Sequence, residues 1–370
     1  MISNQQSVSR SNTSKYAFVT AVFGNKGYII PAISLAKSLR RVTDKYLVCI
    51  YYGLDNNDIY VLGQYFDELV QTSANFDPNS IVIEGENSIK PSVISGDGKY
   101  ISLPNYLSPQ DQTGKDKNYL WRVVITRWTA LNLTNYDKII LLDADTYFFQ
   151  SVDDLFNLEP PAIVIDHRKD NTLVNENNYK QFYKYDQKIK TSYSRNNKFS
   201  KTNIGNLIRN VNSIPQNAFK YLKSIHYGVL GCEGSMILLR PNRDLFKMML
   251  YSIQGTIWDF RTYGSLITSA SRPDEIIPLI GLAELGLEFK TIPFNYMVQN
   301  TLYDKLNEKD RSIVKAVHMN DLKPWFSGKY QEKFEDKRKN EIRRSVIDRW
   351  MSDFPQGWEN YIVNEPVYLS

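Results

Sequence analysis

The stretch KIILLDADTYFF, residues 138–149, constrains the fold of this chain more strongly than any other segment. After Lys138 it begins with four apolar residues, as expected for a central strand of a parallel sheet that is covered on both faces. Asp143 and Asp145 follow that strand directly, one residue apart. Ligands of open parallel sheets bind beyond the carboxyl ends of the strands, so we expect both carboxylates at a binding edge.

Two neighbouring carboxylates raise each other's pKa unless a cation lies between them or they diverge toward other partners. Mg²⁺ or Mn²⁺ would remove this penalty, because these ions take oxygen ligands and keep coordination positions open for phosphate oxygens. The alternative is a turn or helix N-cap aspartate with an unrelated neighbour. The position after a fully apolar strand leaves both interpretations open.

The flanking segments predict an α/β domain. YAFVTAV (16–22) and KYLVCIYY (45–52) are typical of buried strands, and the apolar spacing from Tyr28 to Arg41 predicts a helix between them. A strand, a crossover helix and a second strand in this order imply a parallel sheet with a right-handed connection. Further strands are expected at 138–142, 234–242, 287–294 and 315–319, and helices at about 58–66, 120–133, about 242–253 and 332–351.

Neither an internal repeat nor a Gly-Ser linker divides the 370 residues, which favours one domain with an insertion over two domains. The first 14 residues are rich in Ser, Asn and Gln and are expected to form a disordered tail. Residues 86–117 are expected to form a long loop or lid. The predicted domain spans 15–330 with a mostly helical insertion at about 168–227, and a C-terminal helical extension follows at 331–370.

Composition excludes a disordered chain, with 42% hydrophobic and 13% aromatic residues. The net charge of +5 suits an anionic small molecule as well as a nucleic acid and selects neither. The first residues lack the apolar region of a signal peptide, and no stretch of about 18 uninterrupted apolar residues predicts a membrane span. We therefore expect a soluble protein. Cys49 and Cys232 cannot form a disulfide framework, so we expect both to be reduced, buried side chains, which favours a reducing, cytoplasmic compartment.

The segment DADTYFFQSVDDLF (143–156), together with RWTALNLTNYDKIILL before it, strongly resembles the metal-binding segment of glycosyltransferase family 8, the glycogenin-like retaining enzymes. Further along, VHMNDLKPW (317–325) resembles the family's His…Lys-Pro-Trp segment. The resemblance covers roughly residues 16–76, 119–166 and 231–326. It implies a GT-A (Rossmann-like) fold, with a mostly parallel central sheet flanked by helices, a helical insertion and a C-terminal helix.

The resemblance implies that Asp143, Asp145 and His318 hold Mn²⁺ (or Mg²⁺), while Lys323 meets the diphosphate and Arg127 faces the sugar nucleotide. Glycogenins carry Lys at the position of Arg127. Without the resemblance, His318 would be a histidine at a strand end bonded to backbone, and Arg127 and Lys323 would be ordinary surface side chains. A neutral imidazole and a compact ammonium are nevertheless suitable for a metal and for a phosphate, respectively.

Other matches concern the donor and the acceptor. Thr20, Ala21 and Tyr28 correspond to the positions that hold uracil and ribose, although the spacing at 24–27 differs by one residue and Tyr28 could equally be a core aromatic. Glu233 replaces part of an Asn-Ser-Gly on the acceptor side. Asp274 matches a residue that contacts the transferred sugar, unless it is only a helix N-cap, and Glu275 replaces the family's Gln. The expected nucleotide-sugar contacts are Thr20, Ala21, Tyr28, Arg127, Asp143, Ala144, Asp145, Glu233, Asp274, Glu275, His318 and Lys323.

The implied reaction moves a hexose, with glucose expected, from a UDP-sugar to a hydroxyl of a sugar or protein. Retention would occur by front-face attack within a tight ion pair, with Asp274, Arg127 and Lys323 in catalytic roles. Glycogenins also glucosylate one of their own tyrosines, and Tyr303 is the nearest candidate. A homodimer is left open, and neither a nucleic-acid partner nor a membrane span is expected.

Two rival functions stay open. A metal-dependent nucleotidyltransferase or phosphohydrolase could also use paired aspartates on a parallel sheet, but it would need further carboxylates at a second metal site. A non-catalytic sugar-nucleotide-binding protein on the same fold would have little reason to keep the aspartate pair.

Overall fold

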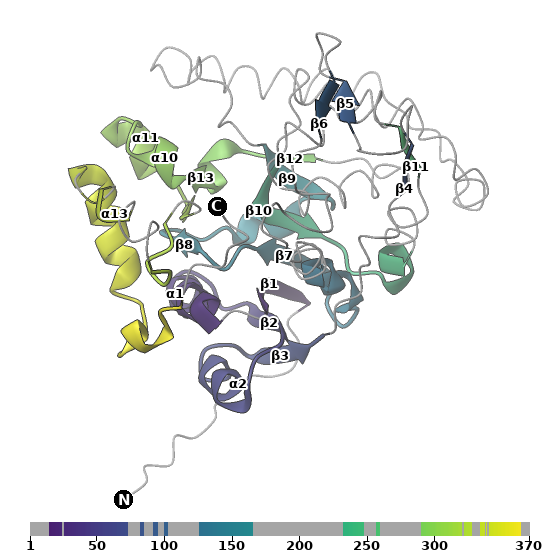
Figure 1. Cartoon of the computed structure of the whole chain (residues 1–370), viewed down its shortest axis with the longest axis horizontal. Helices are drawn as coiled ribbons and strands as arrows, with labels where there is room; N and C mark the ends of the chain where they lie inside the picture. Colours follow the sequence, from purple (N-terminus) through teal and green to yellow (C-terminus); the bar gives the residue numbers. More distant parts are fainter. Residues whose placement is uncertain are drawn as a thin grey trace, which may run out of the picture.

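A seven-stranded sheet forms the centre of the computed structural model (Figure 1). The structure describes residues 15–23, 26–72, 82–84, 92–94, 100–102, 126–165, 232–247, 257–259, 290–319, 322–327, 334–336, 338 and 340–363. The strand order is β12-β9-β10-β7-β1-β2-β3. These strands are β1 (Tyr16–Phe23), β2 (Tyr46–Tyr52), β3 (Glu68–Gln71), β7 (Lys138–Leu142), β9 (Ala162–Ile165), β10 (Cys232–Leu239) and β12 (Lys290–Ile292).

The sheet is mostly parallel, as the sequence predicted. β1 pairs in parallel with β2 on one side and with β7 on the other, and the β2–β3 and β9–β12 pairs are also parallel. β10 alone runs antiparallel to both of its neighbours, β7 and β9. β7 therefore ends at the same edge of the sheet as β1, and this edge carries the aspartate pair.

A second sheet of three short strands continues from that edge. It consists of β8 (Thr146–Phe148), β13 (Val298–Gln299) and β14 (Ala316–His318), in the order β13-β14-β8. β14 pairs antiparallel with β8, which sets His318 opposite Thr146. Because only residues 143–145 separate β7 from β8, the two sheets join at the aspartate pair.

Two pairs of short strands complete the described β structure: β4 (Val82–Glu84) pairs with β11 (Ile257–Asp259), and β5 (Ser92–Ile94) pairs with β6 (Tyr100–Ser102). The second pair lies within 86–117, where the sequence predicted only a loop. Its alternating apolar residues are too few to stand out among the glycines, prolines and serines of that stretch.

The first predicted helix is confirmed as α1 (Ile29–Arg40), which follows a 3₁₀ turn, η1 (Lys26–Tyr28). Pro31 lies in the first turn of α1. N–H groups in the first turn have no acceptor within the helix, so the missing N–H of proline costs no hydrogen bond there. α2 (Asn56–Leu62) starts at its N-cap Asp55, whose side chain accepts a hydrogen bond from the Asp58 N–H at 2.9 Å. The described part of the helix expected at 120–133 is instead 3₁₀, in η3 (Thr126–Asn132).

The helix expected at 332–351 is shorter than predicted. Residues 334–336 are helical, but α13 (Glu341–Met351) begins only after Asn340, whose side chain accepts a hydrogen bond from the Arg343 N–H at 3.0 Å. Asparagine is among the best N-cap residues, so the new helix starts there. The remaining short helical segments are η4 (Asp153–Asn157), η5 (Phe294–Tyr296), α10 (Asn300–Tyr303), α11 (Glu308–Ser312) and η6 (Trp358–Tyr361); residues 243–247 are also helical, inside the helix expected at about 242–253.

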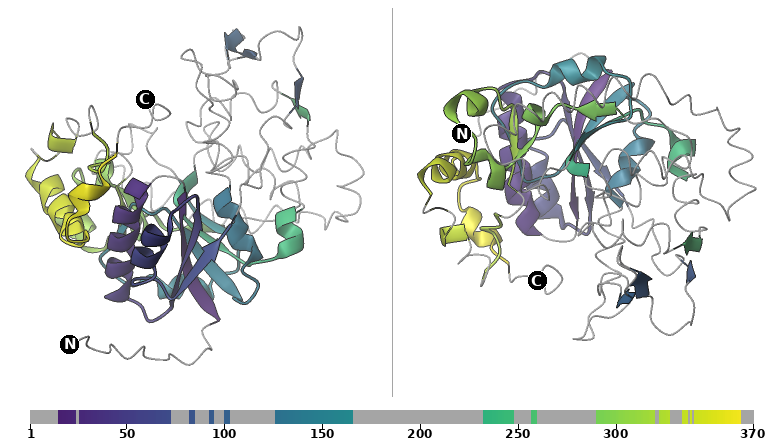
Figure 2. Two further views of the ribbon diagram at one scale, coloured as in Figure 1. Left: turned by 60° about the horizontal axis from the view of Figure 1, so that its bottom comes forward. Right: turned by 90° about the horizontal axis from the view of Figure 1, so that it is seen from above.

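Helix α1 is buried on two sides. Ile29 and Ile33 belong to the main hydrophobic core beneath the sheet, whereas Ile30 belongs to a second core built around Trp325 and Trp350. Figure 2 shows α13 lying alongside α1, and the Ser34 hydroxyl of α1 donates a hydrogen bond to the Trp350 carbonyl at 3.0 Å. The C-terminal helix therefore covers the face of α1 that the sheet leaves open.

Several expectations fall outside the described residues: the tail at 1–14, the insertion at about 168–227, and Asp274 with Glu275. The domain boundaries stay predictions. Among the helices that the structure describes, none has the length and apolar character needed to cross a membrane. Cys49 is a buried free cysteine, as expected.

Candidate active site

The aspartate pair forms the link between the two sheets, and the backbone of each aspartate is anchored separately. The Asp143 N–H donates to the Ser235 carbonyl on β10 at 3.1 Å, and the Asp145 carbonyl accepts from the Met319 N–H at 2.8 Å. Asp145 is buried and Asp143 is half-buried. The two carboxylates therefore start from fixed backbone positions at the carboxyl end of β7.

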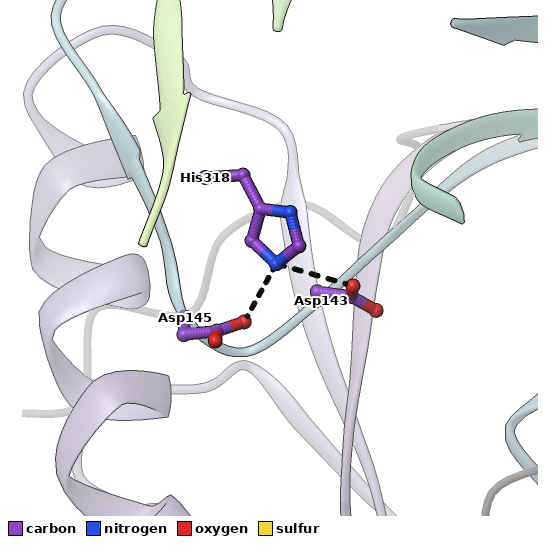
Figure 3. A group of neighbouring side chains, drawn as sticks. All are labelled: Asp143, Asp145 and His318. Carbon is purple, nitrogen blue, oxygen red and sulfur yellow. Dashed lines mark hydrogen bonds and ion pairs between the residues drawn. The ribbon is translucent and has the colours of Figure 1, made fainter. Parts of the chain in front are cut away.

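His318 brings the third side chain to this point from the end of β14. Its Nε2 lies 3.2 Å from Asp145 Oδ1 and 3.4 Å from Asp143 Oδ2 (Figure 3). One ligand atom from each of the three side chains lies within 4.8 Å of the other two. The antiparallel pairing of β14 with β8 causes this convergence, because it sets His318 beside the residue that follows Asp145.

This group fits a divalent cation. Two carboxylate oxygens and one imidazole nitrogen are common ligands of first-row divalent metals, and carboxylate oxygen is also the preferred ligand of Mg²⁺ and Mn²⁺. A single Nε2 can bear at most one proton, so it cannot donate a full hydrogen bond to both carboxylates at once. The interpretation of Asp143 and Asp145 as a simple turn does not account for their convergence with a buried histidine.

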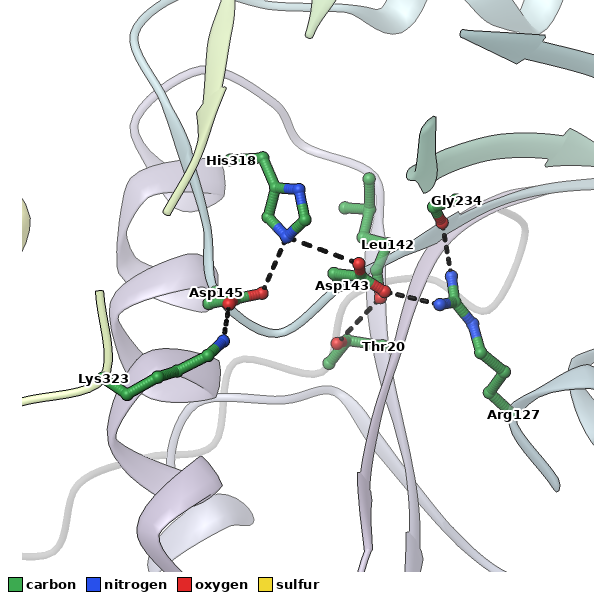
Figure 4. Close-up of polar contacts among 8 residues, drawn as sticks. All are labelled: Thr20, Arg127, Leu142, Asp143, Asp145, Gly234, His318 and Lys323. Atoms are coloured by element: carbon green, nitrogen blue, oxygen red, sulfur yellow. Dashed lines mark hydrogen bonds and ion pairs between the residues drawn. The ribbon is translucent and has the colours of Figure 1, made fainter. Parts of the chain in front are cut away.

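Each carboxylate also meets a basic side chain through its other oxygen (Figure 4). Lys323 pairs with Asp145 Oδ2, and Arg127 Nη1 lies 2.5 Å from Asp143 Oδ1. Arg127 Nη2 also donates to the Gly234 carbonyl on β10 at 2.6 Å. His318 and the two basic residues thus divide the four carboxylate oxygens, with one oxygen of each aspartate facing the imidazole.

The surroundings keep Asp145 ionised. Burial raises the pKa of its carboxyl, but the Lys323 ammonium and the His318 imidazole outweigh burial and hold that pKa well below its usual value. A metal ligand must be deprotonated, so Asp145 is ready to bind a cation at neutral pH.

Lys323 lies near two aromatic rings and is mostly buried, so it is not the surface lysine of the simpler interpretation. Its Nζ lies 5.4 Å from the ring centre of Tyr28 and 5.5 Å from that of Trp325, within the range of cation–π attraction. Burial raises the pKa of the Tyr28 hydroxyl, and Lys323 lowers it in part. The sequence assigned no role to Trp325, although its place two residues after Lys323 was the available signal.

The other expected residues are placed as follows. Thr20 is buried, and its hydroxyl donates to the Leu142 carbonyl at 3.1 Å, so it joins β1 to the end of β7. Ala21 is half-buried and Ala144 is buried. Glu233 lies in β10, where its backbone is in register with Val164. Contact of these residues with a nucleotide sugar stays a prediction.

Arg127 binds one of the candidate metal ligands directly. Its guanidinium pairs with Asp143 and donates to a backbone carbonyl of β10, and contact with a sugar nucleotide stays a prediction. Its side chain is only 7% exposed. In this position Arg127 orients a candidate metal ligand, a task for which the planar fork of arginine is suited.

Comparisons with known proteins identify the family of this chain. Residues 19–328 match the family model described as "Glycosyl transferase family 8". A curated relative, uncharacterized protein R707 of Acanthamoeba polyphaga mimivirus, is 26% identical over 151 residues, which are 40% of this chain and 42% of the relative. The match thus spans less than half of that relative's length.

Two solved structures are also similar. One is the apo structure of the bifunctional glycosyltransferase WbbM, with 11% identity and a TM-score of 0.45, covering 94% of this chain and 51% of that chain. The other is the galactosyltransferase LgtC in complex with donor and acceptor sugar analogs, with 12% identity and a TM-score of 0.44, covering 93% of this chain and 99% of that chain.

Proposed function

Because the chain belongs to glycosyl transferase family 8, we propose that it is a retaining glycosyltransferase that moves a hexose from a UDP-sugar to a hydroxyl acceptor. The observation that carries this proposal is the convergence of Asp143, Asp145 and His318 at the carboxyl end of β7. The mostly parallel sheet agrees with the GT-A fold that the resemblance implies. UDP-glucose is the donor we expect.

Asp143, Asp145 and His318 would hold the metal, for which we propose Mn²⁺ or Mg²⁺. When bound, such an ion supplies positive charge near the diphosphate that leaves the sugar. The ionised state of Asp145 and the fixed backbone of both aspartates support this assignment. Arg127 keeps one oxygen of Asp143 turned away from the imidazole, which leaves the other oxygen directed toward His318.

Lys323 would stabilise the leaving group. Its ammonium lies at the edge of the ligand cluster, where it pairs with Asp145, and a diphosphate bound there would come within its reach. The bond from the anomeric carbon to the diphosphate oxygen breaks, the acceptor oxygen bonds to that carbon on the same face, and the proton of the acceptor hydroxyl passes to the departing diphosphate oxygen. We propose, from the resemblance, that Asp274 places the sugar for this front-face attack.

The test is release of UDP from a panel of UDP-sugars in the presence of Mn²⁺. We expect Asp145→Asn to lower the rate by about 100-fold or more, since loss of one electrostatic contact to a leaving group typically costs about 3 kcal/mol. Asp154→Asn is the matched control, because Asp154 is an acidic residue paired with Lys315 and Tyr296 outside the cluster. Circular dichroism would verify that both variants fold. Turnover that continues in excess chelator would contradict the proposal.

The same assay separates the rival functions. A phosphohydrolase would yield UMP and sugar 1-phosphate, and a nucleotidyltransferase would move the UMP group to an acceptor and release sugar 1-phosphate. A binding protein would take up the donor without releasing UDP. Within the ranges that the structure describes, Asp143, Asp145 and His318 form the one cluster of three metal-binding side chains, so a two-metal mechanism finds no second set of ligands there.

Self-glucosylation of Tyr303 is a further part of the proposal, motivated by the family resemblance. Tyr303 belongs to α10, is half-buried, and its ring stacks on Phe149 with centroids 5.9 Å apart. Intact-mass measurement after incubation with UDP-glucose and Mn²⁺ should show added hexose in the wild type and none in Tyr303→Phe. An unchanged wild-type mass under conditions of turnover would reject it.

A further inference from the structure

Trp325 connects the candidate donor site to the C-terminal part of the chain. Its ring lies 5.6 Å from that of Tyr28 and 5.8 Å from that of Trp350, in edge-to-face arrangements in both cases. The same ring lies 5.5 Å from the Lys323 ammonium. Trp325 is fully buried, so its position depends on the side chains around it.

A backbone contact holds the same loop. The Val363 N–H donates to the Trp325 carbonyl at 2.9 Å, and the Val363 carbonyl accepts from the Ser327 N–H at 3.1 Å. These two hydrogen bonds form a parallel bridge between Val363 and Phe326. The loop that carries Lys323 is therefore bound to the C-terminal segment by its backbone as well as by Trp350.

Residues 340–363, here called the C-terminal clamp, are in turn anchored to α1. The Trp350 carbonyl accepts from Ser34, and Asp353 pairs through both carboxylate oxygens with Arg41, at 2.9 and 2.5 Å. Phe354 packs edge-to-face on Trp350 with centroids 5.0 Å apart. The clamp lies beyond residue 328, where the match to the family model ends.

We propose that the C-terminal clamp is a positioning element of the donor site, which holds Lys323 in place through Trp325. The inference rests on the proposed function, because it assigns Lys323 to the diphosphate. Trp350 and Val363 act on Lys323 through the tryptophan and do not touch the substrate themselves.

The physical reason is the conformational freedom of lysine. A lysine side chain loses much rotamer entropy when it is fixed, so a site that holds its loop and its neighbouring ring in advance binds a phosphate with less entropy loss. Tyr28 and Trp325 both attract the ammonium, and the clamp fixes Trp325. Loosening the clamp should therefore weaken diphosphate binding.

The first test is Val363→Pro, which removes the N–H that binds the Trp325 carbonyl. The preceding Ile362 has φ −62° and ψ 126°, a conformation that a residue before proline readily adopts. Val363→Ala is the matched control, because it shortens the side chain and keeps the N–H. UDP affinity in saturating Mn²⁺ and Mn²⁺ affinity without nucleotide are measured by calorimetry for each full-length protein.

We expect Val363→Pro to weaken UDP binding by about fivefold, the equivalent of one hydrogen bond, without weakening Mn²⁺ binding. Val363→Ala keeps the N–H and loses only part of the side chain that packs against the second core, so it should weaken UDP binding less than Val363→Pro does. In a Lys323→Met background, Val363→Pro should cause no further loss, because its effect is transmitted by Lys323. If the clamp served folding alone, Val363→Pro would lower the melting temperature but would not produce a loss of UDP affinity that depends on Lys323.

The inference is overturned if folded Val363→Pro binds UDP normally. It is also overturned if Val363→Pro lowers the UDP affinity by the same factor in the wild-type and Lys323→Met backgrounds. If Val363→Pro does not fold, Trp350→Phe enters the same cycle, since it shrinks the ring beside Trp325 and keeps the carbonyl that binds Ser34. A wild-type protein that binds no UDP in Mn²⁺ would overturn the proposed function itself, and the clamp's role would fall with it.

Discussion

Replacing Lys323 by methionine should change metal binding and nucleotide binding in opposite directions. A cation held by Asp145 would share this carboxylate with the Lys323 ammonium, which pairs with Oδ2 while Oδ1 faces His318. Methionine keeps an unbranched apolar side chain against Tyr28 and Trp325 and removes only the positive charge. The variant therefore frees Asp145 for the metal and takes a counter-charge away from the diphosphate.

The expected changes in Mn²⁺ affinity and UDP affinity can be worked out from the burial of the Lys323–Asp145 ion pair. The side chains of Lys323 and Asp145 are 12% and 5% exposed, so water screens their interaction weakly. A hydrogen bond to a charged group contributes about 1.5–3 kcal/mol. At about 1.4 kcal/mol per factor of ten, Mn²⁺ should bind Lys323→Met about 10- to 100-fold more tightly in the absence of nucleotide. UDP in saturating Mn²⁺ should bind more weakly by a factor of similar size.

Isothermal titration calorimetry at neutral pH measures both affinities. Lys315→Met is the matched control, because Lys315 also pairs with an aspartate, Asp154, at 3.0 Å and lies over an aromatic ring, that of Tyr296, at 4.0 Å. We expect both affinities to be unchanged in this control. Equal or weaker Mn²⁺ binding by Lys323→Met would refute the idea that the ammonium and the metal share Asp145.

Two further predictions concern stability. Arg127→Met removes the guanidinium that pairs with Asp143 and leaves only His318 beside this carboxylate, so the free energy of unfolding in urea should fall by about 3 kcal/mol. Saturating Mn²⁺ should reduce the difference from the wild type, because the metal compensates the same carboxylate. If Arg127→Met loses the same free energy of unfolding with and without Mn²⁺, then Arg127 and the metal do not share the Asp143 carboxylate. The second prediction uses acid: the pKa of Asp145 is lower in the folded protein than the 3.8 of the free side chain, so the unfolded chain takes up its proton first as pH falls. The stability that Asp145 contributes is fully present above about pH 4 and is lost progressively below it. Metal-free wild type should therefore lose stability more steeply than Asp145→Asn between neutral pH and pH 3, and parallel curves from urea titrations would contradict this.

The sequence predicted the central strands well because an apolar run such as KIILL leaves few alternatives. It could not predict that β10 runs against its neighbours, since residues 234–239 are buried whichever way the strand points. The new start of α13 was also missed, because the charges before Asn340 continue the pattern of a solvated helix and hide the N-cap.

The sequence likewise predicted part of the candidate site and missed another part. The family resemblance implied that Asp143, Asp145 and His318 form one cluster, and the structure brings them together. The pairing of Arg127 with Asp143 depends on β10, whose Gly234 carbonyl holds the guanidinium from more than a hundred residues away in the chain. Such a contact arises from packing between strands and leaves no periodic signal in the sequence.

The link between the two sheets has a consequence for how the protein matures. Asp145 and His318 are 173 residues apart in the chain, and they meet only after β14 has docked onto β8. A divalent ion held by both would act as a removable crosslink across that whole span, and only a molecule with both sheets assembled could retain it. Metal uptake would thus mark the completion of folding.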